Sequence, residues 1–287
     1  MIKIRSAIFF VMAVLLSLSS MAQQSVLWRI TGNGLTKPSY LFGQMDYICP
    51  HDYLWTKSMA DCFAKSDKVC LQVNAADGAV LKKISDGLVD RSGKKLEDYF
   101  SPADYIAVSK FAKDTFHLTI ANVQALKPVA LQPFIIKHLL GCVDAVSYDK
   151  RILEDAQKAG KQIQGLETAE DILNEIQLTH FNNKVAAVLA EIANGSNYYH
   201  EFRAGIMDAY QHQDIKQINT IFKTARSFTP EDFNVFLNEK SKRWVSRMPA
   251  MMQQSSVFFS VNAINLWGDD GVISLLKKAG YTVEPVL

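Results

Sequence analysis

The sequence lacks the short motifs that mark several common enzyme classes. It has neither the His-Glu-x-x-His pair of zinc proteases nor the Gly-x-Ser-x-Gly turn of serine hydrolases. Its four cysteines form no Cys-x-x-Cys pair, which argues against a zinc knuckle. Lysine and arginine are nowhere dense, and 31 basic residues nearly balance 29 acidic ones. The charge pattern therefore argues against a nucleic-acid-binding protein.

Long apolar runs are also missing after the first 22 residues. The chain starts with basic Lys3, continues through an apolar stretch at residues 7–16, and reaches a small-residue cleavage site at Ala22. That stretch is shorter than the roughly 20 residues that cross a bilayer. We expect residues 1–22 to be a cleaved export signal, which would leave the mature protein periplasmic or extracellular without a transmembrane segment.

The remaining chain, residues 23–287, has the composition of a folded domain. It contains no low-complexity tract, and apolar residues make up 48% of the whole sequence. Such a chain can bury a substantial core, so we expect one large domain or two closely packed halves.

The cysteines predict disulfide bonding. An exported chain with an even cysteine count can form two bridges, and four cysteines allow three pairings. One hypothesis is a Cys49–Cys142 bridge, which would connect the region after the second predicted strand to a distant helix.

Apolar patterning predicts alternating strands and helices, and therefore an α/β fold. Ser101-Pro102 and Thr229-Pro230 each combine an N-cap residue with a proline in the first turn, and Gly160 ends a helix. The predicted strands span residues 25–30, 39–42, 68–73, 162–166, 257–261 and 281–286. The predicted helices cover residues 52–64, 147–159 and 269–279, begin at 101, 168 and 229, and occupy 119–140 and 183–226 with breaks.

Two four-residue loops, 43–46 and 262–265, each follow an apolar strand and lead towards a helix and another strand. The first and last parts of the chain thus share one architecture. Open α/β sheets bind ligands outside the carboxyl ends of their strands, so these loops are the expected site. Asp46 and Asn265 occupy equivalent places in the loops, and we expect them to face a shared cleft.

Three separate blocks carry a family resemblance. They are the opening stretch at residues 25–46, the Gly-Leu-Glu-Thr block at Gly165–Thr168, and the closing stretch at residues 265–286. In these blocks the chain resembles the TraB/GumN family, which includes the Tiki proteins. The resemblance implies an α/β domain related to the erythromycin esterase and ChaN-like fold. Two strand-loop-helix-strand units would then flank a central helical region.

The same resemblance implies a metalloprotease site in some members, with two Gly-x-x-His motifs and acids on an early strand. This chain departs from that pattern at nearly every polar position. Both histidines are replaced, and the acids of the strand motif have become amides, whereas Glu167 is kept. The replaced positions fall on Gly43–Asp46, Asn262–Asn265, Gln72 and Asn74 of the strand, and Lys240-Ser241 in place of an Arg-Asn pair.

Amide side chains donate electrons weakly and cannot act as general bases, whereas imidazoles and carboxylates hold Zn²⁺, Mn²⁺ or Co²⁺. The concerted substitutions therefore predict a non-catalytic family member without a metal cofactor. The retained cleft would bind a peptide or a polar small molecule through hydrogen bonds. Its predicted binding residues are Gly43, Asp46, Gln72, Asn74, Glu167, Lys240, Asn262 and Asn265.

The residues leave alternatives open. An active hydrolase would use Asp46 and Glu167, either with a divalent metal such as Mn²⁺ or Zn²⁺ or without one; Gln72 and Asn265 would complete its candidate catalytic set. A third alternative is a purely structural envelope protein. Individual residues also have plainer interpretations: Asp46 as a cap, Glu167 as a partner of a helix N-terminus, and Lys240 as a lysine extending to water. His51 could replace a missing ligand through a shifted loop, and its plainer interpretation is a surface residue.

Overall fold

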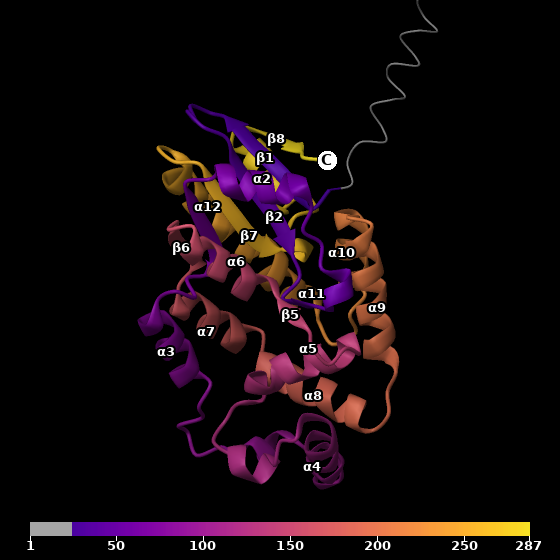
Figure 1. The fold of residues 1–287 in the computed structure, drawn as a ribbon. Helices are drawn as coiled ribbons and strands as arrows, with labels where there is room; N and C mark the ends of the chain where they lie inside the picture. The colour runs from indigo at the N-terminus through magenta and orange to yellow at the C-terminus, as the bar shows by residue number, and fades with distance from the viewer. Residues whose placement is uncertain (1–24) are drawn as a thin grey trace, which may run out of the picture.

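The computed structural model describes residues 25–287, so the predicted export signal at residues 1–22 lies outside the described residues. A twisted sheet forms one end of the molecule and a helical region forms the other (Figure 1). Among residues 25–287, no helix combines the length and the apolar character needed to cross a membrane.

The sheet has six strands in the order β6-β4-β7-β2-β1-β8. The first four strands run parallel, whereas β1 is antiparallel to both of its neighbours. The predicted strands and the mixed α/β class are thereby confirmed. The strands are β1 (Leu27–Gly32), β2 (Ser39–Gln44), β4 (Lys68–Val73), β6 (Gln162–Glu167), β7 (Val257–Asn262) and β8 (Tyr281–Pro285).

The central strands β2 and β7 are buried along almost their whole length, as expected for parallel strands that are covered on both faces. On one face, Phe42 and Phe258 pack at 5.9 Å between ring centroids, and Trp55 and Tyr148 each meet Phe42 edge-on. Helices α2 (Lys57–Lys65) and α6 (Tyr148–Lys158) belong to this layer. Helices α12 (Lys240–Met252) and α13 (Val272–Lys278) pack against each other and against β6 and β8.

The helical region has its own apolar core, separate from that of the sheet. Buried residues such as Leu96, Val108, Leu131 and Leu189 belong to it. The helices in the middle and lower parts of Figure 1 are α3 (Gly78–Gly87), α4 (Pro102–Phe116), α5 (Gln132–Leu140), α7 (Ala169–Leu178) and α8 (Phe181–Ala193). Helix α9 (Tyr198–Gln211) runs from this region up beside the sheet, where α10 (Ile215–Phe222) packs against it, and buried residues of both helices belong to the core of the sheet.

Several boundaries differ from the prediction. The first helix begins at Lys57, because the Thr56 hydroxyl accepts the amide N–H of Met59 and caps it there. The last helix begins at Val272 instead of Asp269. Helix α3 was not predicted. Nor were the short strands β3 (Tyr47–Ile48) and β5 (Val146–Ser147) and the short 3-10 helices η2 (Pro50–Asp52), η3 (Leu96–Tyr99) and η7 (Ala263–Asn265). The interrupted helix predicted over residues 119–140 consists of the 3-10 helices η4 (Ile120–Val123) and η5 (Pro128–Leu131) followed by α5.

The long helix predicted from Thr229-Pro230 is divided. A single turn, α11 (Pro230–Phe233), leads into a π-helical segment, η6 (Asn234–Glu239), before α12 begins at Lys240. π-Helical turns within longer helices are rare and frequently lie at functional sites. This one adjoins the loop after β7, as described below.

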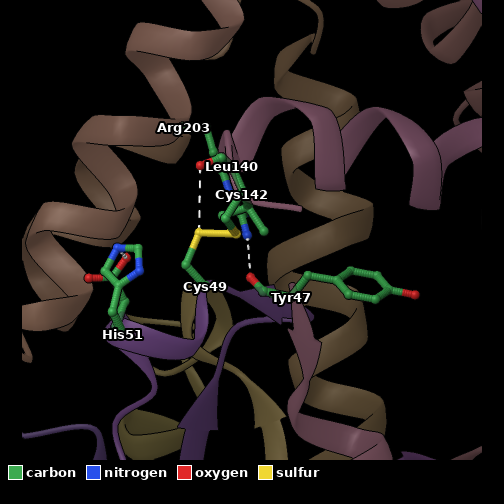
Figure 2. The surroundings of a disulfide bond; sticks show 7 residues. Tyr47, Cys49, His51, Leu140, Cys142 and Arg203 are labelled. Carbon is green, nitrogen blue, oxygen red and sulfur yellow. Dashed lines mark hydrogen bonds and ion pairs between the residues drawn. A yellow bond between two sulfur atoms is a disulfide. The ribbon is translucent and has the colours of Figure 1, made fainter. Parts of the chain in front are cut away.

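The Cys49–Cys142 disulfide is present, with 5.9 Å between the two Cα atoms, and this hypothesis is confirmed. It joins the segment after β3 to the segment after α5 (Figure 2). Cys62 and Cys70 are buried and unpaired, so the expectation of a second bridge is wrong. Apart from the backbone, one disulfide therefore connects the sheet side of the molecule to the helical region.

Replacing both bridged cysteines, Cys49→Ala with Cys142→Ala, should lower the free energy of unfolding. The bridge spans 93 residues, for which loop-closure entropy alone predicts a loss of about 4.6 kcal/mol. Chemical denaturation of oxidised wild-type protein and the double variant would measure the difference. Adding reductant should destabilise the wild type and leave the double variant unchanged. Equal stability of the two proteins under oxidising conditions would contradict the prediction.

Candidate functional site

A cavity of about 460 Å³ lies at the carboxyl ends of the parallel strands, where the sheet meets the helical region. Its sheet end is polar, and most of the remaining wall is apolar. The polar end brings together Asp46, Gln72, Glu167, Lys240, Asn262 and Asn265, all of them candidates from the sequence. The apolar wall includes Ile135, Val185, Val188, Phe202, Phe228 and Phe236.

The two loops predicted to share a cleft do lie side by side. Strands β2 and β7 are parallel neighbours, and Gln44 at the end of β2 is in register with Asn262 at the end of β7. Asn262 donates from Nδ2 to Asp46 Oδ1 over 3.5 Å and accepts the Ile264 amide N–H through its own Oδ1. No backbone N–H of the described residues bonds to the Asp46 carboxylate, so Asp46 does not act as a cap. Burial raises the pKa of Asp46, although Arg203 and Lys240 oppose the shift.

Asn265 holds the π-helical segment in place. Its Nδ2 lies 2.7 Å from the carbonyl oxygen of Phe236 and 3.4 Å from Ser241 Oγ. In a regular α-helix the Phe236 carbonyl would accept the N–H of Lys240, but that N–H bonds instead to the carbonyls of Val235 and Leu237. The buried Asn265 amide thus satisfies a carbonyl that the π-turn releases. This is a structural role that an imidazole would perform differently.

Glu167 ends β6 and enters a network of charges. Its Oε1 lies 2.7 Å from Arg243 Nη2, and its Oε2 lies 3.5 Å from Lys240 Nζ. Lys240 is closer to Glu175, at 2.8 Å, and Arg247 Nη1 lies 2.6 Å from Asp171 Oδ2. Three carboxylates of β6 and α7 therefore face three cations of α12. The helix N-terminus beside Glu167 is capped by Thr168 and Asp171 instead.

Lys240 reaches into the cavity and does not extend to water, because its side chain is only 14% exposed. Burial lowers the pKa of its ammonium, but Glu167 and Glu175 more than offset this and hold that pKa above its ordinary value. Burial raises the pKa of Glu175, with Lys240 and Arg243 opposing the shift. Lys240 is therefore a charged partner of two carboxylates and not a free base.

The sequence did not single out Asp149, which lines the same cavity from the first turn of α6. Gln44 Nε2 donates to its Oδ1 over 3.4 Å, a long hydrogen bond, and the Oε1 of the same fully buried Gln44 has no donor in the described residues. Burial raises the pKa of Asp149 to about 7, and the negative charge of Asp46 adds to the shift. The site therefore contains a carboxyl that titrates near neutrality.

Arg203 of α9 is the second cavity residue that the sequence did not single out. Its Nη2 donates to the carbonyl oxygen of Tyr47 over 2.9 Å, beside the Cys49–Cys142 bridge (Figure 2). Its Nε is buried without a partner among the described residues. Burial lowers the pKa of this guanidinium, and Asp46 opposes the shift. Arg203 thus brings a positive charge to the end of the cavity that holds Asp46.

Three sequence candidates lie elsewhere. Gly43 is fully buried and packs against Leu266; a Cβ built on it would come within 2.4 Å of that side chain, so its role is close packing. Asn74 Oδ1 accepts the amide N–H of Ala76 and forms a turn outside the cavity wall. His51 is exposed and pairs with Asp52 at 3.3 Å, away from the cavity.

The donor set does not fit the transition-metal site that the family resemblance implies. None of the six histidines, all within the described range, lines the cavity. Glu167 is bonded to Arg243 and Lys240, and the Asn265 amide is bonded to Phe236. A cysteine, histidine and aspartate group does occur at Cys49, His51 and Asp52, but the sulfur of Cys49 is already in the disulfide. No step of chemistry is therefore assigned to a metal.

These features define an α/β protein with a ligand-sized cavity at the carboxyl ends of its parallel strands. The sequence pattern of the TraB/PrgY/gumN family matches residues 26–285, and the chain belongs to that family. It is 22% identical over 321 residues to the Danio rerio protein named metalloprotease TIKI2. The alignment covers 91% of this chain and only 60% of that relative. No solved structure matches the chain.

Asp149→Asn should change how stability depends on pH. The folded protein keeps the Asp149 proton up to about pH 7, whereas an unfolded aspartate loses it near 4. Between these values the folded state binds more protons, so this group makes stability fall as pH rises, by up to about 1.4 kcal/mol per unit. The free energy of unfolding, measured by denaturation at pH 5 and at pH 8, should fall less between these two pH values in the variant than in the wild type. The exposed Asp155→Asn on the same helix should retain the wild-type loss.

Lys240→Met should destabilise the protein by about 3 kcal/mol, because it leaves Glu175 and Glu167 buried with fewer partners. Thermal and urea denaturation would measure this loss. Lys242→Met is the matched control: that lysine is half-exposed, pairs with Glu239 on the same helical segment, and should cost under about 0.5 kcal/mol. Adding Glu175→Gln to Lys240→Met should restore part of the stability. An equal loss of stability in the two lysine variants would show that the ion pairs of Lys240 add nothing to the stability of the fold.

Proposed function

We propose that this protein is an exported, non-catalytic member of the TraB/PrgY/gumN family that binds a peptide or a polar small molecule in its cavity. The observation that carries the proposal is the composition of the polar end. Amides of Gln72, Asn262 and Asn265 stand beside charges that are largely paired within the protein. Such a wall offers hydrogen bonds to a ligand and lacks the imidazoles that hold a catalytic metal.

The proposal includes the location and the domain organisation. Export is supported by the basic-then-apolar start of the sequence and by the Cys49–Cys142 disulfide, a bond typical of oxidising compartments. Residues 1–22 would be the signal and residues 23–287 the functional domain, with a fold related to that of erythromycin esterase and ChaN-like proteins. Within this domain the ligand would meet Asp46, Gln72, Glu167, Lys240, Asn262 and Asn265, while Gly43 and Asn74 shape the loops behind them.

The second candidate is a hydrolase that uses carboxyl groups. It is favoured by the joint presence of Asp46 and Asp149 in one cavity and by the similarity to a protein named metalloprotease. A divalent ion would need these carboxylates and Glu167 as ligands. The ion pairs of Glu167 with Arg243 and Lys240 oppose that use, so the binding function is the better supported of the two.

A metal-binding assay separates the two functions. Titrating purified protein with Mn²⁺, Co²⁺ or Zn²⁺ should give no saturable rise in melting temperature, and a model peptide should not be cleaved in a chelator-sensitive way. The positive control is a variant with Asp46→His, Asn265→His, Gln72→Glu and Asn262→Gly, which restores the family ligands and should bind metal. Saturable binding by the wild type, abolished in the Asp46→Ala, Glu167→Ala double variant, would overturn the non-catalytic proposal.

A further inference from the structure

The charges around the cavity do not balance. In the network of β6, α7 and α12, Glu167, Asp171 and Glu175 face Lys240, Arg243 and Arg247, so three negative charges meet three positive ones. Lys184, which also lines the cavity, pairs with Asp232 at 2.9 Å. Each of these charged side chains therefore has an ion-pair partner within the protein.

The remaining charged groups that line the cavity are Asp46, Asp149 and Arg203. Two carboxylates thus face one guanidinium, and no ion pair within 4 Å joins Arg203 to either of them in the described residues. The corner of the cavity that these three side chains form therefore carries one uncompensated negative charge when both carboxyls are ionised. Uncompensated charge in a partly desolvated site is costly, and a bound cation would remove that cost.

The same corner has too few hydrogen-bond donors. The donors that reach the two carboxylates are Asn262 Nδ2, at 3.5 Å from Asp46, and Gln44 Nε2, at 3.4 Å from Asp149. Both distances are at the long limit for a hydrogen bond. Gln44, which is fully buried, also leaves its Oε1 without a donor in the described part of the chain. The two carboxylates have only these distant donors and Gln44 Oε1 has none, whereas one buried donor, Arg203 Nε, lacks an acceptor among the described residues, so a ligand that presents mainly donors matches this arrangement.

The rest of the cavity determines what such a donor is attached to. Beyond the carboxylates the wall is apolar, with Ile135, Val185, Val188, Phe202, Phe228 and Phe236. A small hydrated ion would leave this wall in contact with water, whereas an apolar segment would cover it and gain about 25 cal/mol for each Å² buried. A lysine-type ammonium has three donors and no acceptor.

We propose that the polar end of this cavity binds a primary ammonium group carried by an apolar segment, with Asp46 and Asp149 as its acceptors and Gln44 as the residue that positions Asp149. This inference rests on the proposed binding function and specifies its ligand class. The amino terminus of an apolar peptide and a lysine side chain within one are the two sources of such an ammonium, since both present the same head group. The experiment separates these sources.

The head group is tested with three probes of equal chain length: n-hexylammonium, hexan-1-ol and hexanoate. Calorimetric titration of the full mature chain should give the ammonium an affinity about tenfold to a hundredfold above that of the alcohol, and hexanoate the weakest. Asp46→Asn and Asp149→Asn should each reduce the preference for the ammonium to within a few-fold of the alcohol. Asp155→Asn, an exposed change on the same helix, should leave the preference intact. The wild-type comparison alone decides the point if a variant fails to fold.

The source of the ammonium is tested with apolar peptides of one sequence. The first has a free amino terminus, the second is N-acetylated with an internal lysine, and the third is N-acetylated with norleucine at that position. Tighter binding of the first or the second than of the third supports the proposal and identifies the source. Equal binding of all three, together with equal affinities for hexylammonium and hexanol, overturns the ammonium site but keeps the binding function. If no peptide and no hexyl probe binds, the binding function itself is wrong.

Discussion

The parallel pairing of β2 with β7 is the constraint on which the site depends. It sets Gln44 opposite Asn262 and so places two loops from opposite ends of the chain against each other. Strands β4 and β6 extend the same edge and add Gln72 and Glu167. Because parallel strands end at one edge of a sheet, residues that are more than 200 positions apart form one wall. A shift of this pairing by one residue would turn each side chain to the opposite face.

Charge balance accounts for the chemical character of that wall. On α12, Lys240, Arg243 and Arg247 follow a spacing of three and four residues, which puts them on one face of the helix. Asp171 and Glu175 lie four residues apart on α7 and face them. Each carboxylate of this group is held by a cation, which keeps it from acting as a free base or a metal ligand. The unbalanced pair, Asp46 and Asp149, is then the part of the wall on which the proposed ligand binding depends.

The sequence predicted the strands well because each is a short apolar run between turn residues, and strand ends follow directly from that pattern. The candidates at strand ends, Asp46, Gln72, Glu167 and Asn262, consequently meet at the cavity. Asp149 and Arg203 were missed because helices α6 and α9 bring them to the site, and helix orientation depends on tertiary packing. Asp149, two residues after the N-cap Ser147, has the ordinary position of a first-turn acid. The charged face of α12 was a usable signal, since its spacing is visible in the sequence.

The segment between β3 and η2 is anchored twice, and this has a consequence for how a ligand reaches the interior. Cys49 is bonded to the end of α5, and the neighbouring Tyr47 carbonyl accepts from Arg203 of α9 (Figure 2). The disulfide and this hydrogen bond thus fix the sheet and the helical region to each other along one margin. Any widening between them has to pivot about that margin, while the ion pairs of α12 with Asp171 and Glu175 of α7 hold the two parts together elsewhere. A ligand that enters between the sheet and the helical region would therefore do so without separating them at this margin.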